Sequence, residues 1–139
     1  IELILKIFPK AKFIHTFRDK YDAAIAIFQS MLIYLPWTHS LENIIKYIIN
    51  YEKIINHFKK KYPDKILDIK LENFTSDPKF YSKEIFNFCN LDWNEDVLKF
   101  YDSKSLISKT SSFLQVREKI KNYEKNKYKP YYFLLENKL

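Results

Sequence analysis

The clearest pattern of hydrophobic and polar positions in the chain lies between residues 41 and 61. Apolar side chains recur there every three or four residues, the spacing of one face of an α-helix. The residues of this face are Leu41, Ile44, Ile45, Ile48, Tyr51, Ile55, Phe58 and, just beyond, Tyr62. Thr38 or Ser40 can cap the start, and three lysines close the last turn, where cations suit the helix dipole. The pattern therefore predicts one long helix with a buried face.

Two shorter runs predict strands. Residues 11–17, AKFIHTF, are rich in aromatic and β-branched side chains, and residues 65–71 alternate between apolar and polar positions. Because helices separate the two runs, a parallel pairing through a crossover is the natural arrangement. The expected fold class is therefore α/β, with a partial parallel sheet flanked by helices. Two strands do not complete such a sheet, so we expect an N-terminal part of the fold to be absent from this chain.

The remaining elements follow from prolines, caps and apolar runs. Residues 20–35 are apolar on nearly every side, which predicts a buried helix that Pro36 ends. The other expected elements are an apolar helix end at 1–8 stopped by Pro9, a capped helix at 75–91 with Pro78 in its first turn, a short helix at 94–104, a polar loop or weak strand at 105–116, and mixed helix at 117–139 broken by Pro130.

The composition of the chain excludes several kinds of protein. The chain has 139 residues, a usual length for a single domain spanning 1–139, and it is 47% hydrophobic, enough to form a core. No apolar run is long enough to cross a membrane. The net charge of +7 suits an anionic partner, but the lysines are spread along the chain, which disfavours a nucleic-acid surface. There is no glycine, so the chain has no Gly-rich phosphate loop.

Arg18 is the first candidate for anion binding, because only two of the 24 basic residues are arginines. It follows the first predicted strand and precedes a helix that Asp19 can cap. Ligands of open α/β sheets bind at the carboxyl ends of strands, and a guanidinium there can hold a phosphate through two hydrogen bonds, beside free N–H groups of the helix start. A structural ion pair with an aspartate and plain exposure are the alternatives.

Arg117 is the second arginine, and it follows a group of hydroxyl and amide side chains. These are Thr110, Ser111, Ser112 and Gln115. Such groups with one arginine suit a phosphate or a polar ring edge, although a polar surface loop has the same composition.

Several segments, in the correct order, resemble sulfotransferases that use 3′-phosphoadenosine 5′-phosphosulfate (PAPS), most closely the type associated with tetratricopeptide repeats. The segments are FPKAKFIHTFRDKYDAAIAIFQS, the long helix with the following strand and acidic turn, EIFNFCNLDWNEDVLKFYDSK, TSSFLQVREKI and the final KYKPYYFLLENKL. The resemblance spans nearly the whole chain. It implies a P-loop-like fold of which this chain is the C-terminal portion.

The resemblance implies transfer of a sulfuryl group from PAPS, the cosubstrate, to a hydroxyl or amine, without a metal. Arg18 would hold the 3′-phosphate, and Arg117 would close over the same nucleotide, with Thr110, Ser112 and Gln115 shaping its loop. The loop for the 5′-phosphosulfate is expected upstream, in an N-terminal half or next to tetratricopeptide repeats. The chain alone is therefore expected to be inactive, and a cytoplasmic location is expected.

Three departures from the family pattern weaken the expected nucleotide site. Ala26 replaces a serine that shares the 3′-phosphate, Leu71 replaces a tyrosine near the adenine, and Lys20 with Tyr21 replaces a proline and a second arginine. A non-catalytic remnant or scaffold domain of the same fold therefore stays open, as does a basic helical module that binds nucleic acid. The acceptor is not identified. His39, the only loop histidine, is a candidate general base or a helix-start residue.

Overall fold

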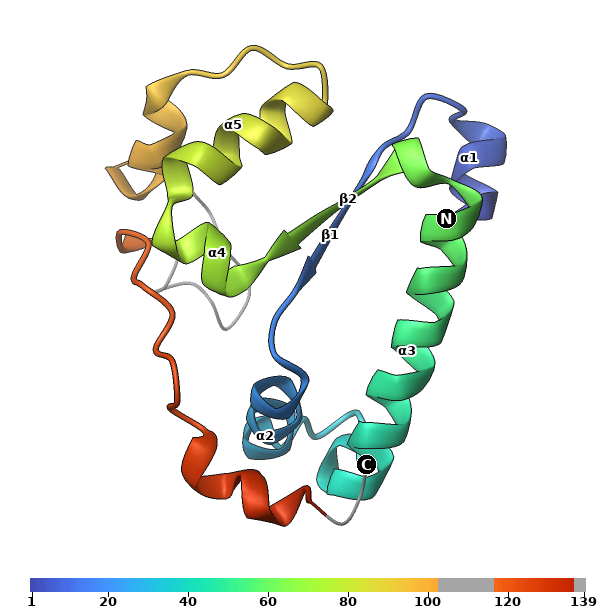
Figure 1. The fold of residues 1–139 in the computed structure, drawn as a ribbon, viewed down its shortest axis with the longest axis vertical. Coiled ribbons are helices and arrows are strands. Elements are labelled where there is room, and N and C mark those ends of the chain that lie inside the picture. The colour runs from blue at the N-terminus through green and yellow to red at the C-terminus, as the bar shows by residue number, and fades with distance from the viewer. Residues whose placement is uncertain (103–116, 137–139) are drawn as a thin grey trace. The chain divides into compact units, whose positions relative to one another are not determined.

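A computed structural model describes residues 1–102 and 117–136 (Figure 1). The chain divides into two compact units. Unit 1 consists of Ile1–Phe13, Phe17–Ile66 and Glu124–Leu139, and unit 2 consists of Ile14–Thr16 and Leu67–Tyr123. The loop or weak strand expected at 105–116 lies outside the described residues.

The sheet of the described residues has two neighbouring strands, β1 (Phe13–Phe17) and β2 (Ile66–Lys70). Figure 1 shows their arrows pointing the same way, so the pair is parallel. The α/β class is thereby confirmed. Within unit 2, His15 Nδ1 lies 2.7 Å from Asp68 Oδ1, which links the two strands through their side chains.

The core of unit 1 forms between α2 (Lys20–Ser30) and the first half of α3 (Leu41–Lys61). Its buried side chains are Ala24, Ile25, Ile44, Ile45 and Leu135. The bounds predicted for α3 are confirmed, and the Asn43 N–H donates to the Ser40 side chain at 3.4 Å. In the second half of α3 the predicted face is only partly buried, because Ile55 and Phe58 are half-buried and Tyr51 is 43% exposed.

The far end of α3 is tied to α1 (Glu2–Ile7) by polar contacts rather than by an apolar core. The Lys61 ammonium pairs with the Glu2 carboxylate, and the Lys65 ammonium donates to the Pro9 carbonyl oxygen at 3.0 Å. Lys65 closes the short helix η2 (Pro63–Lys65), which leads into β2.

The helix predicted over 20–35 is too long. α2 ends at Ser30, and Met31 adopts a left-handed conformation with φ 41°. The next residues run into η1 (Pro36–His39) with exposed apolar side chains. A residue that precedes proline is disfavoured in the α-helical region, so the helix must end before Leu35. An all-apolar run predicts burial but carries no signal for where the helix stops.

The C-terminal part of unit 1 contains η5 (Lys129–Leu134), which contacts α2. The prediction that Pro130 breaks a helix is wrong, because Pro130 lies in the first turn of η5. A proline is tolerated there because the first helical N–H groups have no partner within the helix. Leu135 follows η5 and is fully buried in the core of unit 1.

Unit 2 carries α4 (Leu71–Ser76), α5 (Pro78–Phe88) and η3 (Glu95–Asp102). The predicted capped helix with Pro78 in its first turn is confirmed as α5, although residues 75–76 belong to α4 and α5 ends at Phe88. The Asp77 carboxylate caps α5 by accepting from the Phe80 N–H at 3.0 Å. Trp93 packs back on α5 and donates its indole N–H to the Ser82 hydroxyl at 2.9 Å.

Candidate functional site

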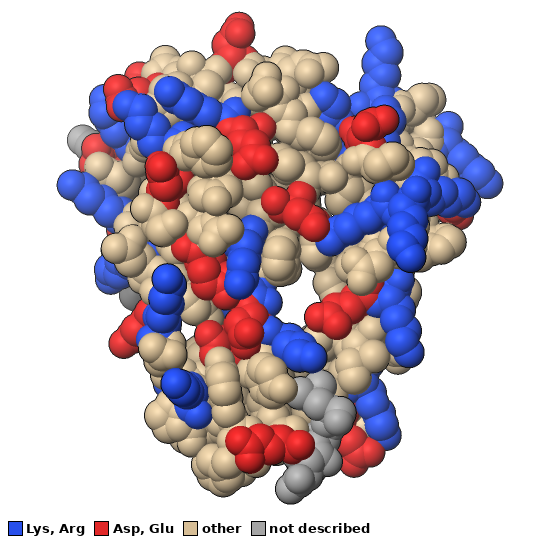
Figure 2. All heavy atoms as spheres, viewed as in Figure 1, with Lys and Arg blue, Asp and Glu red and all other residues tan. Residues whose placement is uncertain are grey.

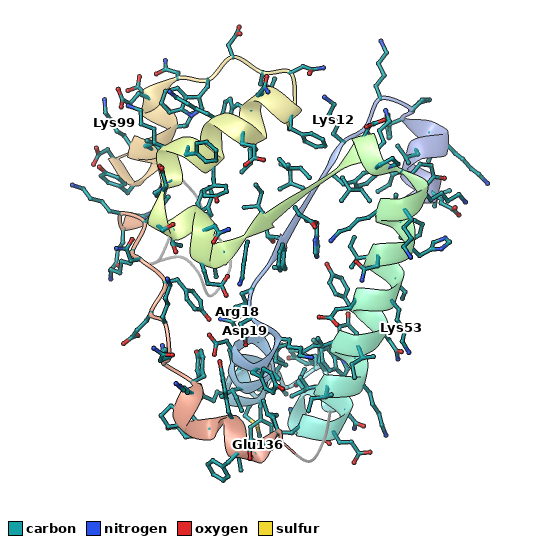
Figure 3. The ribbon with its side chains drawn as sticks, viewed as in Figure 1. Lys12, Arg18, Asp19, Lys53, Lys99 and Glu136 are labelled. Carbon is teal, nitrogen blue, oxygen red and sulfur yellow. The ribbon has the colours of Figure 1, made fainter. Side chains whose placement is uncertain are left out.

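The turn between β1 and α2 carries the first candidate residue. Figure 3 shows Arg18 and Asp19 next to each other at the start of α2. The Asp19 carboxylate accepts from the backbone N–H groups of Tyr21 at 2.9 Å and Asp22 at 3.1 Å. The predicted cap is therefore confirmed. The expectation of free N–H groups beside Arg18 is wrong for these two, because the Asp19 side chain already occupies them.

Replacing Asp19 with alanine is expected to lower the free energy of unfolding by about 1 kcal/mol, since two N–H groups lose their acceptor. Asp19→Asn, which keeps an acceptor oxygen, is the matched control and should cost only a few tenths of that. Thermal unfolding followed by circular dichroism measures both. Equal melting temperatures for Asp19→Ala and the wild type would contradict the role of this cap.

Arg18 itself is half-buried, and its guanidinium carbon lies 5.9 Å from the centre of the Tyr128 ring. Within residues 1–102 and 117–136, no carboxylate forms an ion pair with Arg18. The two structural alternatives, an Arg18–aspartate ion pair and plain exposure, are therefore not seen in the described part of the chain. A guanidinium placed over an aromatic face still directs its N–H donors outward in its own plane, where an anion can accept from them.

A buried carboxylate lies one helical turn from Arg18. Asp22 is 3% exposed, and it accepts a hydrogen bond of 2.6 Å from the Tyr132 hydroxyl. The same hydroxyl lies 3.4 Å from Asp19 Oδ1, and the rings of Tyr132 and Tyr21 are 5.0 Å apart. Partial burial, followed by the hydrogen bond to Asp22, raises the pKa of the Tyr132 phenol well above its usual value. Tyr132 therefore stays a donor to the aspartate.

Sequence reasoning missed Asp22, Tyr128 and Tyr132. Tyr132 is 110 residues from Asp22, so no local spacing links the two. An aspartate in the first turn of an apolar helix was the one available signal, because a buried carboxylate requires a donor from elsewhere in the fold.

The family model described as the sulfotransferase family matches residues 1–95, which is more than half of the chain. The chain belongs to the sulfotransferase family. The matched residues of this sulfotransferase-family chain include β1, the Arg18 turn and α2, whereas Arg117 and η5 lie beyond them.

One relative is an uncharacterized protein of Aquifex aeolicus (strain VF5). It is 30% identical over 135 residues, which cover 94% of this sulfotransferase-family chain. The chain spans 18% of the length of that relative. The relative is therefore much longer than this chain.

The other predicted nucleotide-binding residues of this sulfotransferase-family chain lie in unit 2 or outside the described residues. Arg117 belongs to unit 2 and is exposed, while Arg18 belongs to unit 1. Thr110, Ser112 and Gln115 lie outside the described residues. A shared nucleotide contact of Arg18 and Arg117 stays a prediction.

His39, the candidate general base, is exposed at the end of η1. Its Nε2 lies 3.2 Å from the Leu32 carbonyl oxygen. Because a carbonyl oxygen only accepts, a hydrogen bond forms here in the tautomer that carries its proton on Nε2. The role of His39 as a base stays a prediction.

Two residues that depart from the family pattern, Ala26 and Tyr21, make contacts within the described part of unit 1. Ala26 lies in α2, where its carbonyl oxygen accepts from the Ser30 hydroxyl at 2.7 Å. Tyr21, in place of an arginine, packs its ring against Tyr132, whereas Lys20 is exposed. Tyr21 therefore contributes to the packing of the turn rather than to its charge.

Charge is distributed rather than concentrated. Figure 2 shows Lys and Arg side chains spread over the face in view, with Asp and Glu side chains between them. In the described ranges, no group of three or more His, Cys, Asp or Glu side chains is arranged to hold a metal ion. No helix found among those residues combines the length and apolarity needed to span a bilayer.

Proposed function

We propose that the chain is the C-terminal portion of a PAPS-dependent sulfotransferase domain of the tetratricopeptide-repeat-associated type. Its two units would belong to one P-loop-like domain spanning residues 1–139. An N-terminal half, or tetratricopeptide repeats upstream, would supply the 5′-phosphosulfate site, and the protein would act in the cytoplasm. Together they would transfer a sulfuryl group to a hydroxyl or amine acceptor.

One observation carries this proposal. Arg18 lies in the family-matched residues, at the carboxyl end of β1 and the start of α2, with no carboxylate partner in the described part of unit 1. Because Asp19 occupies two helix N–H groups, binding of a 3′-phosphate at this turn depends chiefly on the Arg18 guanidinium. Arg117, with Thr110, Ser112 and Gln115, would close over the same nucleotide.

The contribution of this chain to transfer is positioning and charge neutralisation. A guanidinium that holds the 3′-phosphate fixes the nucleotide, so that the sulfuryl group meets the acceptor in line. A non-catalytic remnant of the same fold is the second candidate, favoured by Ala26, which offers no hydroxyl to the phosphate.

Adenosine 3′,5′-bisphosphate is expected to raise the melting temperature of the chain by several degrees. A ligand at 100 times its Kd stabilises the folded state by about 2.7 kcal/mol. Differential scanning fluorimetry, with adenosine 5′-monophosphate as the control that lacks the 3′-phosphate, measures this. An equal response to both nucleotides would contradict the proposal. A salt-dependent gel shift with DNA or RNA, without nucleotide protection, would favour a nucleic-acid-binding module instead.

A further inference from the structure

The segment from Tyr128 to Leu135 contacts the Arg18 turn at several points, all within unit 1. The Tyr128 ring faces the Arg18 guanidinium, and the Tyr132 hydroxyl donates to the Asp22 carboxylate at 2.6 Å. Leu135 anchors the end of the segment in the core beside α2 and α3. Two tyrosines, four residues apart, therefore meet the turn that carries the arginine.

The contact between Tyr132 and Asp22 has the geometry of a strong hydrogen bond. An oxygen–oxygen distance of 2.6 Å is typical of a hydroxyl that donates to a charged carboxylate. Because Asp22 is buried in the first turn of α2, loss of this donor removes a short hydrogen bond from a buried carboxylate. We expect the first turn of α2, which begins two residues after Arg18, to shift in response.

The contact between Tyr128 and Arg18 acts on the guanidinium directly. An arginine side chain has many rotamers, and fixing it in one of them costs entropy at the moment of binding. Packing against an aromatic face restricts the guanidinium before the ligand arrives. The ring of Tyr21 packs against that of Tyr132, with the ring centres 5.0 Å apart.

We propose that Tyr132 and Tyr128 are positioning residues for the Arg18 turn. Through Asp22 and the guanidinium face, the C-terminal segment sets the affinity for a nucleotide 3′-phosphate without touching the nucleotide. This inference rests on the proposed function, because it requires Arg18 to bind that phosphate. The raised pKa of the Tyr132 phenol agrees with it, since a neutral phenol remains a donor across the physiological range.

The test compares Tyr132→Phe with Tyr131→Phe in the full chain, because Tyr131 is the neighbouring tyrosine and is 44% exposed. Isothermal titration gives the Kd for adenosine 3′,5′-bisphosphate and for adenosine 5′-monophosphate. Tyr132→Phe should weaken binding of the bisphosphate by about five- to tenfold and leave the monophosphate unchanged. Tyr131→Phe should change neither. Tyr132→Phe combined with Arg18→Lys should bind no more weakly than Arg18→Lys alone.

The outcomes separate this inference from the proposed function. If the wild type does not distinguish the two nucleotides, the proposed function fails. If the wild type distinguishes them and Tyr132→Phe does so equally well, the positioning role is overturned. The same holds if Tyr132→Phe weakens both nucleotides equally, or if its effect adds to that of Arg18→Lys, since either result indicates a merely structural role.

A second pair of variants serves if Tyr132→Phe does not fold. Tyr128→Phe keeps an aromatic face under the guanidinium, and Tyr128→Leu removes it. The phenylalanine variant should keep the wild-type preference for the bisphosphate, and the leucine variant should lose about three- to fivefold of it. Equal preference in the two variants would overturn the proposed role of the aromatic face.

Discussion

Replacing Arg18 with lysine is expected to weaken the binding of adenosine 3′,5′-bisphosphate by about 10- to 100-fold. The substitution keeps the positive charge but removes the planar fork that holds two phosphate oxygens at once. Asp19 occupies the N–H groups of Tyr21 and Asp22, so those donors do not compensate for the loss. Isothermal titration of both proteins at one salt concentration measures the change.

The matched control is Lys53→Arg, which exchanges the same two side chains in the opposite direction. Lys53 is exposed on α3, in the same unit as Arg18, and Figure 3 shows it on that helix. This control should leave the Kd unchanged. If Arg18→Lys binds the nucleotide as tightly as the wild type does, a guanidinium fork at residue 18 plays no part in binding.

Truncating Leu135 to alanine is expected to lower the free energy of unfolding by about 2–5 kcal/mol, because it leaves a cavity among buried side chains. Leu135 is 0% exposed and packs with Ala24, Ile25, Ile44 and Ile45. Thermal unfolding measures the effect as a fall in melting temperature.

Leu134→Ala is the control for this truncation, since Leu134 is the preceding residue and is 38% exposed. It removes the same atoms from a partly solvated position and should cost less than about 1 kcal/mol. Equal falls in melting temperature for the two variants would show that the end of the chain does not belong to the core of unit 1.

The sequence predicted best those elements that combine a regular spacing of apolar residues with residues that mark where the element ends. α3 occupies the predicted residues because its apolar spacing, the cap at Ser40 and the lysines before Pro63 agree with one another. The two strands were found within two residues of their observed ends. α2 was extended too far because residues 31–35 continue its apolar composition, although Met31 reverses the backbone.

The candidate site could be predicted only in its local part. Arg18 and its cap Asp19 follow from a strand, a turn and a helix start that are contiguous in sequence. The partners of the turn, Tyr128 and Tyr132, come from the other end of the chain, and only the fold brings them to α2. A tyrosine in a short helix that begins with a proline carries no periodic signal that would identify a distant aspartate.

The central claim is that Arg18 binds the 3′-phosphate of the nucleotide. A crystal structure of the chain with adenosine 3′,5′-bisphosphate tests it most directly. The claim predicts oxygens of the 3′-phosphate about 2.7–2.9 Å from the Arg18 guanidinium nitrogens. A nucleotide bound elsewhere, or one whose 3′-phosphate faces solvent while Arg18 stays on the Tyr128 ring alone, would contradict it.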